Sequence, residues 1–194
     1  ERAGNAVDLG GRDAEVWCAA LREAVALVKR FLPTHAAERR LLAQVVVPVG
    51  WDAERHFSCS YENAPGAMYL SLHPDPVKMA EALVHEFQHD KLHALLRLDP
   101  LLDNDRAATY RSPVRPDARP LHGVLLAAHA FLAVAAMYRA MRDAGHEATK
   151  HGRFRARMDE VRAANVDCLA MLDAHARPTA LGAQLLAEMR TLTP

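Results

Sequence analysis

The sequence predicts a single, mainly helical α+β domain in which a small antiparallel sheet packs on a helical core. Its 194 residues suit one domain of ordinary size, and a content of 51% hydrophobic and 25% charged residues is typical of a globular chain. Apolar residues recur at three- and four-residue intervals over most of the chain, which indicates amphipathic helices. Three short β-branched or alternating stretches between residues 45 and 72 indicate strands.

The first part of the chain is expected to form two helices and then the sheet. Residues 1–12 are polar and contain glycine, so we expect a frayed, flexible end. Helical periodicity covers residues 13–32 and ends at Pro33, and a second helix is predicted over 34–42. The predicted strands are 45–49, 57–61 and 67–72, with a turn at Asn63-Ala64-Pro65-Gly66.

A third helix is expected over residues 76–97. Asp75 can cap its first amides, and Pro76 occupies a first-turn position that needs no amide hydrogen. Residues 99–119 lack helical periodicity and are rich in proline and aspartate, so we expect a long loop that forms a lid or wall of a functional site, the alternative being a plain surface loop. The remaining predicted helices are 120–142, 153–176 and a last one that follows Pro178 and ends near Leu192.

The helix predicted over residues 76–97 carries a His-Glu-x-x-His metal-site signature. His85 and His89 lie one turn apart and about 40° apart around the axis, so both imidazoles can reach one ion. Glu86 is close enough to act on a metal-bound water or on a substrate. Because an unpaired imidazole is costly to bury in so apolar a helix, a metal ion explains the pair better than a core role does.

A firmly held ion needs a third protein ligand. His93 lies about 12 Å along the axis from His85, too far to share the same ion. The helix over 120–142 contains no glutamate but has His129 on an apolar face, with His122 two turns earlier. We therefore expect the metal between these two helices, with His129 or His122 as the third ligand; we expect His122 to lie near the helix end and to be exposed. The alternative for His129 is a core histidine bonded to a carbonyl group.

Two kinds of metal chemistry fit such a site. Three neutral histidines suit zinc or ferrous iron, and ligand type alone does not separate them. A zinc peptidase would use Glu86 as the general base that deprotonates the attacking water. A non-haem iron oxygenase would bind a 2-oxoacid and O2, and would need a cation for the distal carboxylate. Arg111, Arg115 and Arg119 lie in the predicted loop, and their planar guanidinium groups suit bidentate carboxylate binding.

Charge and cysteine content narrow the classes of function. The formal net charge is +0, so no overall field favours nucleic acid or an acidic membrane as a partner. The three cysteines are too widely spaced for a disulfide framework or a zinc ribbon, and they indicate a reducing, cytoplasmic environment. We also expect no signal peptide and no membrane span, since no run approaches the ~18 apolar residues that cross a bilayer.

Several ordered motifs between residues 43 and 142 resemble one enzyme family. These motifs are Leu72-His73-Pro74-Asp75-Pro76, Leu83-Val84-His85-Glu86-Phe87-Gln88-His89, Lys91-Leu92, Ala94-Leu95-Leu96, Pro100-Leu101, Tyr110, Ser112-Pro113-Val114-Arg115-Pro116-Asp117-Ala118-Arg119-Pro120-Leu121, Gly123-Val124-Leu125 and Ala130-Phe131. Together they look like the HExxH-type 2-oxoglutarate-dependent peptide β-hydroxylases of bacterial ribosomal-peptide gene clusters. Two positions depart from the family pattern: Val114 stands where a tryptophan is usual, and His129 stands where an aromatic residue is expected.

The resemblance implies a dioxygenase that uses Fe(II), 2-oxoglutarate and O2 to hydroxylate the β-carbon of a residue in a precursor peptide. His85 and His89 carry over as metal ligands, and His129 is assigned as the third. Glu86 would then orient the substrate, while Arg115 and Arg119 are candidates for the cosubstrate carboxylate. A zinc metallopeptidase and a non-catalytic peptide-binding module are the alternatives. The modified residue and the oligomeric state stay open.

Overall fold

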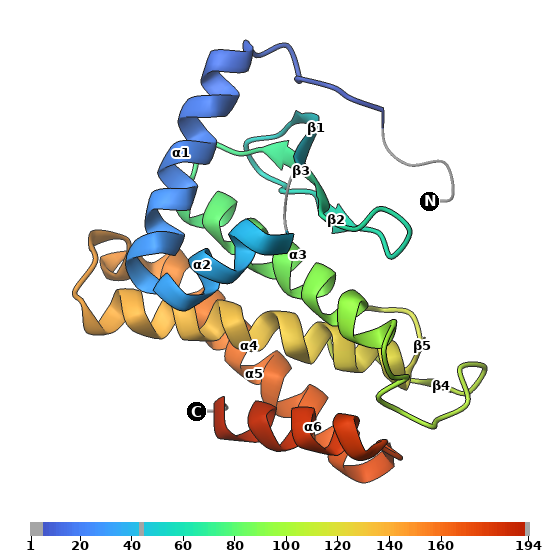
Figure 1. The fold of residues 1–194 in the computed structure, drawn as a ribbon. Coiled ribbons are helices and arrows are strands. Elements are labelled where there is room, and N and C mark those ends of the chain that lie inside the picture. Colours follow the sequence, from blue (N-terminus) through green and yellow to red (C-terminus); the bar gives the residue numbers. More distant parts are fainter. Residues whose placement is uncertain (1–5, 43–44, 193–194) are drawn as a thin grey trace. The chain divides into compact units, whose positions relative to one another are not determined.

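The computed structural model describes residues 6–42 and 45–192, and it confirms the mainly helical α+β class (Figure 1). The chain forms two compact units, residues 1–90 and 91–194, while the single domain expected from the sequence stays a prediction. The boundary falls within helix α3 (Pro76–Leu96). The first unit therefore contains the sheet and most of α3, and the second contains the remaining helices.

In the first unit, two helices precede a three-stranded sheet. α1 (Ala14–Phe31) and α2 (Pro33–Leu42) agree closely with the predicted ranges. The segment expected to be frayed extends into the described part of the chain, where the amide of Asp8 donates to the carbonyl of Pro48 at 2.9 Å. The strands are β1 (Val45–Trp51), β2 (Ser58–Ser60) and β3 (Ala67–Leu72).

The sheet is mixed, so the prediction of an antiparallel sheet was wrong for one of its two strand pairs. The strand order is β1-β3-β2, with β3 in the centre. β2 and β3 pair in antiparallel register around the predicted turn, whereas β1 and β3 pair in parallel. The reason is that residues 52–57 carry the chain past the central position, so that β2 forms the far edge and β3 then returns between the two.

α3 begins where its sequence predicts. The carboxylate of Asp75 accepts a hydrogen bond from the amide of Val77 at 2.8 Å, which is the expected cap, and Pro76 is the first helical residue. The apolar face of α3 is buried, and so are the β3 side chains Met68, Leu70 and Leu72. They form the core of the first unit, which includes Met68, Leu70, Leu72, Met79, Leu83, Val84 and Phe87.

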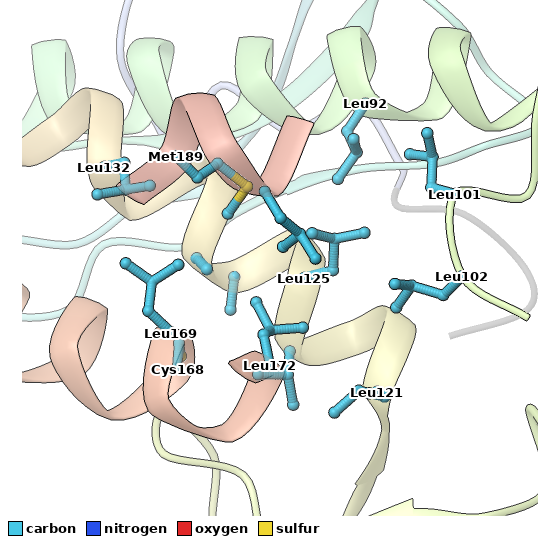
Figure 2. Close-up of a cluster of buried hydrophobic side chains, with 14 residues drawn as sticks. Leu92, Leu101, Leu102, Leu121, Leu125, Leu132, Cys168, Leu169, Leu172 and Met189 are labelled. Carbon is cyan, nitrogen blue, oxygen red and sulfur yellow. The ribbon is translucent and has the colours of Figure 1, made fainter. Parts of the chain in front are cut away.

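In the second unit, three long helices enclose one hydrophobic core. They are α4 (Leu121–Asp143), α5 (Gly152–His175) and α6 (Ala180–Leu192), with a short 3-10 turn, η1 (Glu147–Lys150), between the first two. Figure 2 shows leucines from α4 and α5 pointing toward one another, with Met189 of α6 beside them. Leu92, Leu101 and Leu102 belong to the same buried hydrophobic cluster.

The predicted loop over residues 99–119 contains only two short strands, β4 (Thr109–Tyr110) and β5 (Arg119–Pro120), which pair with each other. Its first part is tied to the α5–α6 junction. Leu101 is fully buried with a φ of 62°, and its carbonyl accepts from the amide of Thr179 at 3.0 Å. The Thr179 hydroxyl in turn donates to Asp99 at 2.6 Å.

α4 is long and apolar enough on average to resemble a membrane span, although it has no uninterrupted apolar run of that length. Its 23 residues pass a test of length and hydropathy for crossing a bilayer, yet 67% of the most apolar stretch is buried inside the protein. A buried helix of this kind is typical of the core of a soluble protein. The apolar face of α4 is therefore accounted for by packing within its own unit.

Candidate metal centre

His85 and His89 lie together on one half-buried face of α3. Their Nε2 atoms are 3.0 Å apart, and the two rings are nearly perpendicular, with centroids 4.5 Å apart. This separation corresponds to an N–H···N hydrogen bond between the rings. It also matches two nitrogens bound to one ion at right angles, which lie about 3.0 Å apart when each bond is about 2.1 Å; a tetrahedral angle would give about 3.4 Å.

Glu86 points away from open solvent and toward the sheet. The side chain is only 2% exposed, and its Oε2 accepts a hydrogen bond from the Ser60 hydroxyl of β2 at 2.6 Å. The same hydroxyl lies 3.3 Å from the main-chain oxygen of Glu86. The carboxylate therefore ties β2 to the motif helix, next to the first histidine of the pair.

The opposite side of α3 is fixed by α2. The Gln88 amide donates to Nδ1 of His35 at 3.3 Å, and the His35 ring packs edge-on against Phe87 with centroids 4.7 Å apart. Phe87 and Gln88 directly follow Glu86 in the sequence, so their contacts with His35 fix α3 at the level of the histidine pair. The sequence did not indicate His35, because only the tertiary packing brings it to α3.

Asp90, which follows the second histidine, is also buried. Burial raises the pKa of Asp90 to about 6, although the backbone of Gly66 lowers it in part. Gly66 directly precedes β3, so this side of α3 faces the centre of the sheet. The buried face of α3 near the pair thus carries two carboxyl groups, Glu86 against β2 and Asp90 near β3.

The other predicted site residues belong to the second unit. His129 lies on α4 and is half-buried. His122, which was expected to be exposed, is only 6% exposed, and its Nε2 donates to the carbonyl of Leu102 at 3.2 Å. That expectation was wrong because the loop after α3 folds over the first turn of α4. Burial lowers the pKa of His122, with Arg106 lowering it further.

The loop arginines differ in their surroundings. Arg119 donates from Nε to the carboxylate of Asp117 at 2.9 Å, and both side chains are largely exposed. Arg111 and Arg115 are exposed. Arg119 would therefore have to exchange one carboxylate partner for another in order to bind a cosubstrate.

Within either unit, the described residues include no group of three or more His, Cys, Asp or Glu side chains able to hold a metal ion. The histidine pair of α3 lies in the first unit, whereas His129 lies in the second. The pair alone can occupy two coordination positions. Assignment of a third ligand to His129 stays a prediction.

A second pair of histidines, one between β1 and β2 and one between β3 and α3, was not singled out from the sequence. His56 and His73 have ring centroids 6.1 Å apart, and Nδ1 of His73 accepts from the amide of Asp75 at 2.9 Å. Burial, and then the nearby His73, lowers the pKa of His56 to about 4. In the sequence, this pair was signalled solely by His73, which belongs to the Leu72–Pro76 motif that leads into α3.

Comparison with protein-family models and with curated proteins gave no match to this sequence. The chemistry of the candidate centre therefore depends on its own residues and on the motif resemblance.

Proposed function

We propose that the protein is an Fe(II)- and 2-oxoglutarate-dependent oxygenase that hydroxylates the β-carbon of a residue in a ribosomally made precursor peptide. The observation that carries the proposal is the 3.0 Å separation of the Nε2 atoms of His85 and His89. Two imidazoles this close on one half-buried helix face can both bind one ion, and neutral histidines suit ferrous iron as well as zinc. Three free cysteines are compatible with a cytoplasmic enzyme.

The imidazole pair would hold the ion by its Nε2 atoms, and His129 is our candidate for the third ligand. When bound, ferrous iron would couple oxidative decarboxylation of 2-oxoglutarate to insertion of one oxygen atom of O2 into a C–H bond, releasing succinate and CO2. Proton and metal compete for the same Nε2 atoms, because the hydrogen bond between the rings must be given up when the ion binds.

The environment of Glu86 favours oxidation over peptide hydrolysis. A peptidase needs this carboxylate as a general base that is available to a metal-bound water. Here it is buried and accepts the Ser60 hydroxyl at 2.6 Å, which suits a group that holds a binding surface in place. We therefore assign Glu86 to positioning of the peptide and not to proton abstraction.

Recognition of 2-oxoglutarate would fall to the exposed arginines of the loop. A planar guanidinium can bind the distal carboxylate through two parallel hydrogen bonds. Arg115 is the better candidate of the two proposed, because Arg119 already binds Asp117 at 2.9 Å. Arg115→Lys keeps the charge but removes the planar fork, so it should raise the KM for 2-oxoglutarate more than it lowers kcat.

The test of the proposed function is an anaerobic incubation with Fe(II), 2-oxoglutarate and a random-sequence peptide pool, to which O2 is then admitted. Succinate and peptide masses are followed together. The proposal predicts O2-dependent succinate and peptides heavier by one oxygen atom, both lost in the double variant His85→Ala/His89→Ala. Cleaved peptides without an O2 requirement would identify a zinc peptidase, and an unchanged pool without succinate would refute the oxygenase.

A further inference from the structure

The outer edge of β2 offers unpaired backbone groups. The amide of Ser71 donates to the carbonyl of Phe57 at 2.8 Å, so Phe57 and, two residues later, Cys59 direct their backbone groups toward β3. The amides and carbonyls of Ser58 and Ser60 consequently face the other way. Within the described residues, β2 pairs with β3 and with no other strand, so these four groups form no ladder with a further strand.

This edge lies on the same side of α3 as the histidine pair. The Ser60 hydroxyl contacts both the carboxylate and the main chain of Glu86, so β2 lies directly on the helix at that residue. At 100° per residue, His89 is about 60° and His85 about 100° from Glu86 in one direction around the helix. Asp90, near the backbone before β3, is about 40° away in the other direction.

β2 therefore separates the centre of the sheet from the imidazole pair. Neighbouring strands lie about 4.8 Å apart, so a chain added outside β2 would run over the side of α3 that carries His89 and His85. Phe57, which is 47% exposed, lies at the start of this edge and offers apolar surface to one side chain of such a chain.

We propose that the outer edge of β2 binds an extended peptide segment by strand addition, with hydrogen bonds to the backbone of Ser58 and Ser60. That this peptide is the substrate rests on the proposed function. An extended backbone is the occupant that matches these groups, because it repeats one donor and one acceptor every two residues on the side that faces β2.

The Ser60–Glu86 hydrogen bond gives the edge its position. It joins the strand that would hold the peptide to Glu86, which directly follows the proposed metal ligand His85 in the sequence. A residue of the peptide opposite Ser60 would thus be the one presented to the metal centre. Glu86 is in this sense a positioning residue for the peptide.

The decisive variant is Ser58→Pro, with Ser58→Ala as its matched control. Proline removes the outward amide without removing a bond to β3, and edge strands tolerate it. Alanine removes the hydroxyl and keeps the amide. Thermal unfolding of both variants is recorded to verify the fold, and size-exclusion chromatography records any self-association through this edge.

The probe is a twelve-residue peptide selected from a random library for binding to the wild-type protein, without iron and without O2. Its Kd is measured for each variant, and each of its amides is then N-methylated in turn against the wild-type protein. Loss of one outward hydrogen bond with the added steric bulk should weaken binding about tenfold or more in Ser58→Pro and leave Ser58→Ala within about twofold. N-methylation should weaken binding at every second position.

Equal affinities for Ser58→Pro and Ser58→Ala, with no alternation along the peptide, would overturn strand addition. A selection that yields no binding peptide would overturn it as well. If Ser58→Pro abolished self-association of the protein and left its affinity for the peptide unchanged, the edge would bind a second copy and the proposal would also be overturned. If the proline variant fails to fold, the N-methyl series on the wild-type protein still decides. Because this binding needs no iron, O2 or turnover, its failure is distinguishable from failure of the oxygenase proposal.

Discussion

At the scale of single residues, the candidate centre is organised by which way three neighbouring side chains point. His85 and His89 share the half-buried face of α3 and bring their Nε2 atoms to 3.0 Å, whereas Glu86 turns toward the sheet and accepts the Ser60 hydroxyl. The four-residue spacing of His85 and His89 on the helix brings their rings together. The contact of Glu86 with Ser60 depends on where β2 lies, which local sequence does not determine.

Glu86→Gln should separate the two kinds of metal chemistry. An amide oxygen can still accept the Ser60 hydroxyl, so we expect O2-dependent succinate formation to fall by less than about tenfold, whereas loss of a general base would cost about a hundredfold to ten-thousandfold. Ser60→Ala is the matched control, since it removes the same hydrogen bond and leaves the carboxylate intact. A thousandfold loss in Glu86→Gln alone would show that the carboxylate transfers a proton.

His56 should make stability depend on pH. Its pKa is about 4 in the folded protein, lowered by burial and then by His73, against about 6.5 in the unfolded chain. Between these values the unfolded chain binds a proton that the folded protein does not, so the unfolding free energy falls as pH falls, by up to about 3 kcal/mol.

The raised pKa of Asp90 acts in the opposite sense over the same range, since its protonated form is favoured in the folded protein. The comparison of wild type with His56→Gln cancels that contribution. Urea unfolding at about pH 7.5 and about pH 5 should show a smaller loss of stability in the variant. Equal losses of stability in wild type and in His56→Gln would contradict the lowered pKa of His56.

At the scale of elements, the segment 99–105 makes a close backbone contact with α6. A Cβ added at Gly182 would lie 1.8 Å from the Leu101 carbonyl oxygen, and Leu101 is buried with a φ of 62°. Neither partner can move away easily, because Thr179 holds both the Leu101 carbonyl and, through its hydroxyl, Asp99. The loop therefore begins from a fixed point on the helical core.

Gly182→Ala should destabilise the protein by more than about 2 kcal/mol, because backbone must shift to admit the methyl group. Gly152→Ala, at the start of α5, is the matched control. An added Cβ meets no atom within 4 Å there, and alanine favours the helix, so stability should be unchanged or higher by up to about 1 kcal/mol. Chemical unfolding of both variants checks this, and similar midpoints would contradict the described contact.

Elements were predictable from the sequence to the extent that their signals are local. α1, α3 and α4 follow apolar periodicity and proline positions, and Asp75 caps α3 as expected. The parallel pairing of β1 with β3 was missed, because alternation within a strand carries no record of its neighbours. The burial of His122 was missed for the same kind of reason, since its partner Leu102 is 20 residues away.

At the scale of the whole molecule, the chain forms two compact units, and α3 runs through their boundary. The prediction of the metal pair needed only the helical repeat within α3. The assignment of a third ligand needs the relation between α3 and α4, which no local pattern in the sequence encodes. His129 therefore remains a prediction, as do Arg115 and Arg119 for the cosubstrate.

An anaerobic titration with Fe(II) tests the central claim, that the imidazoles of His85 and His89 grip one ion. The wild-type protein should bind one equivalent, and each of His85→Ala and His89→Ala should bind it at least about a hundredfold more weakly, because two ligands do not hold an ion firmly. His151→Ala, which removes an exposed imidazole, should bind like wild type. Unchanged Fe(II) affinity in the His85→Ala/His89→Ala double variant would contradict the account.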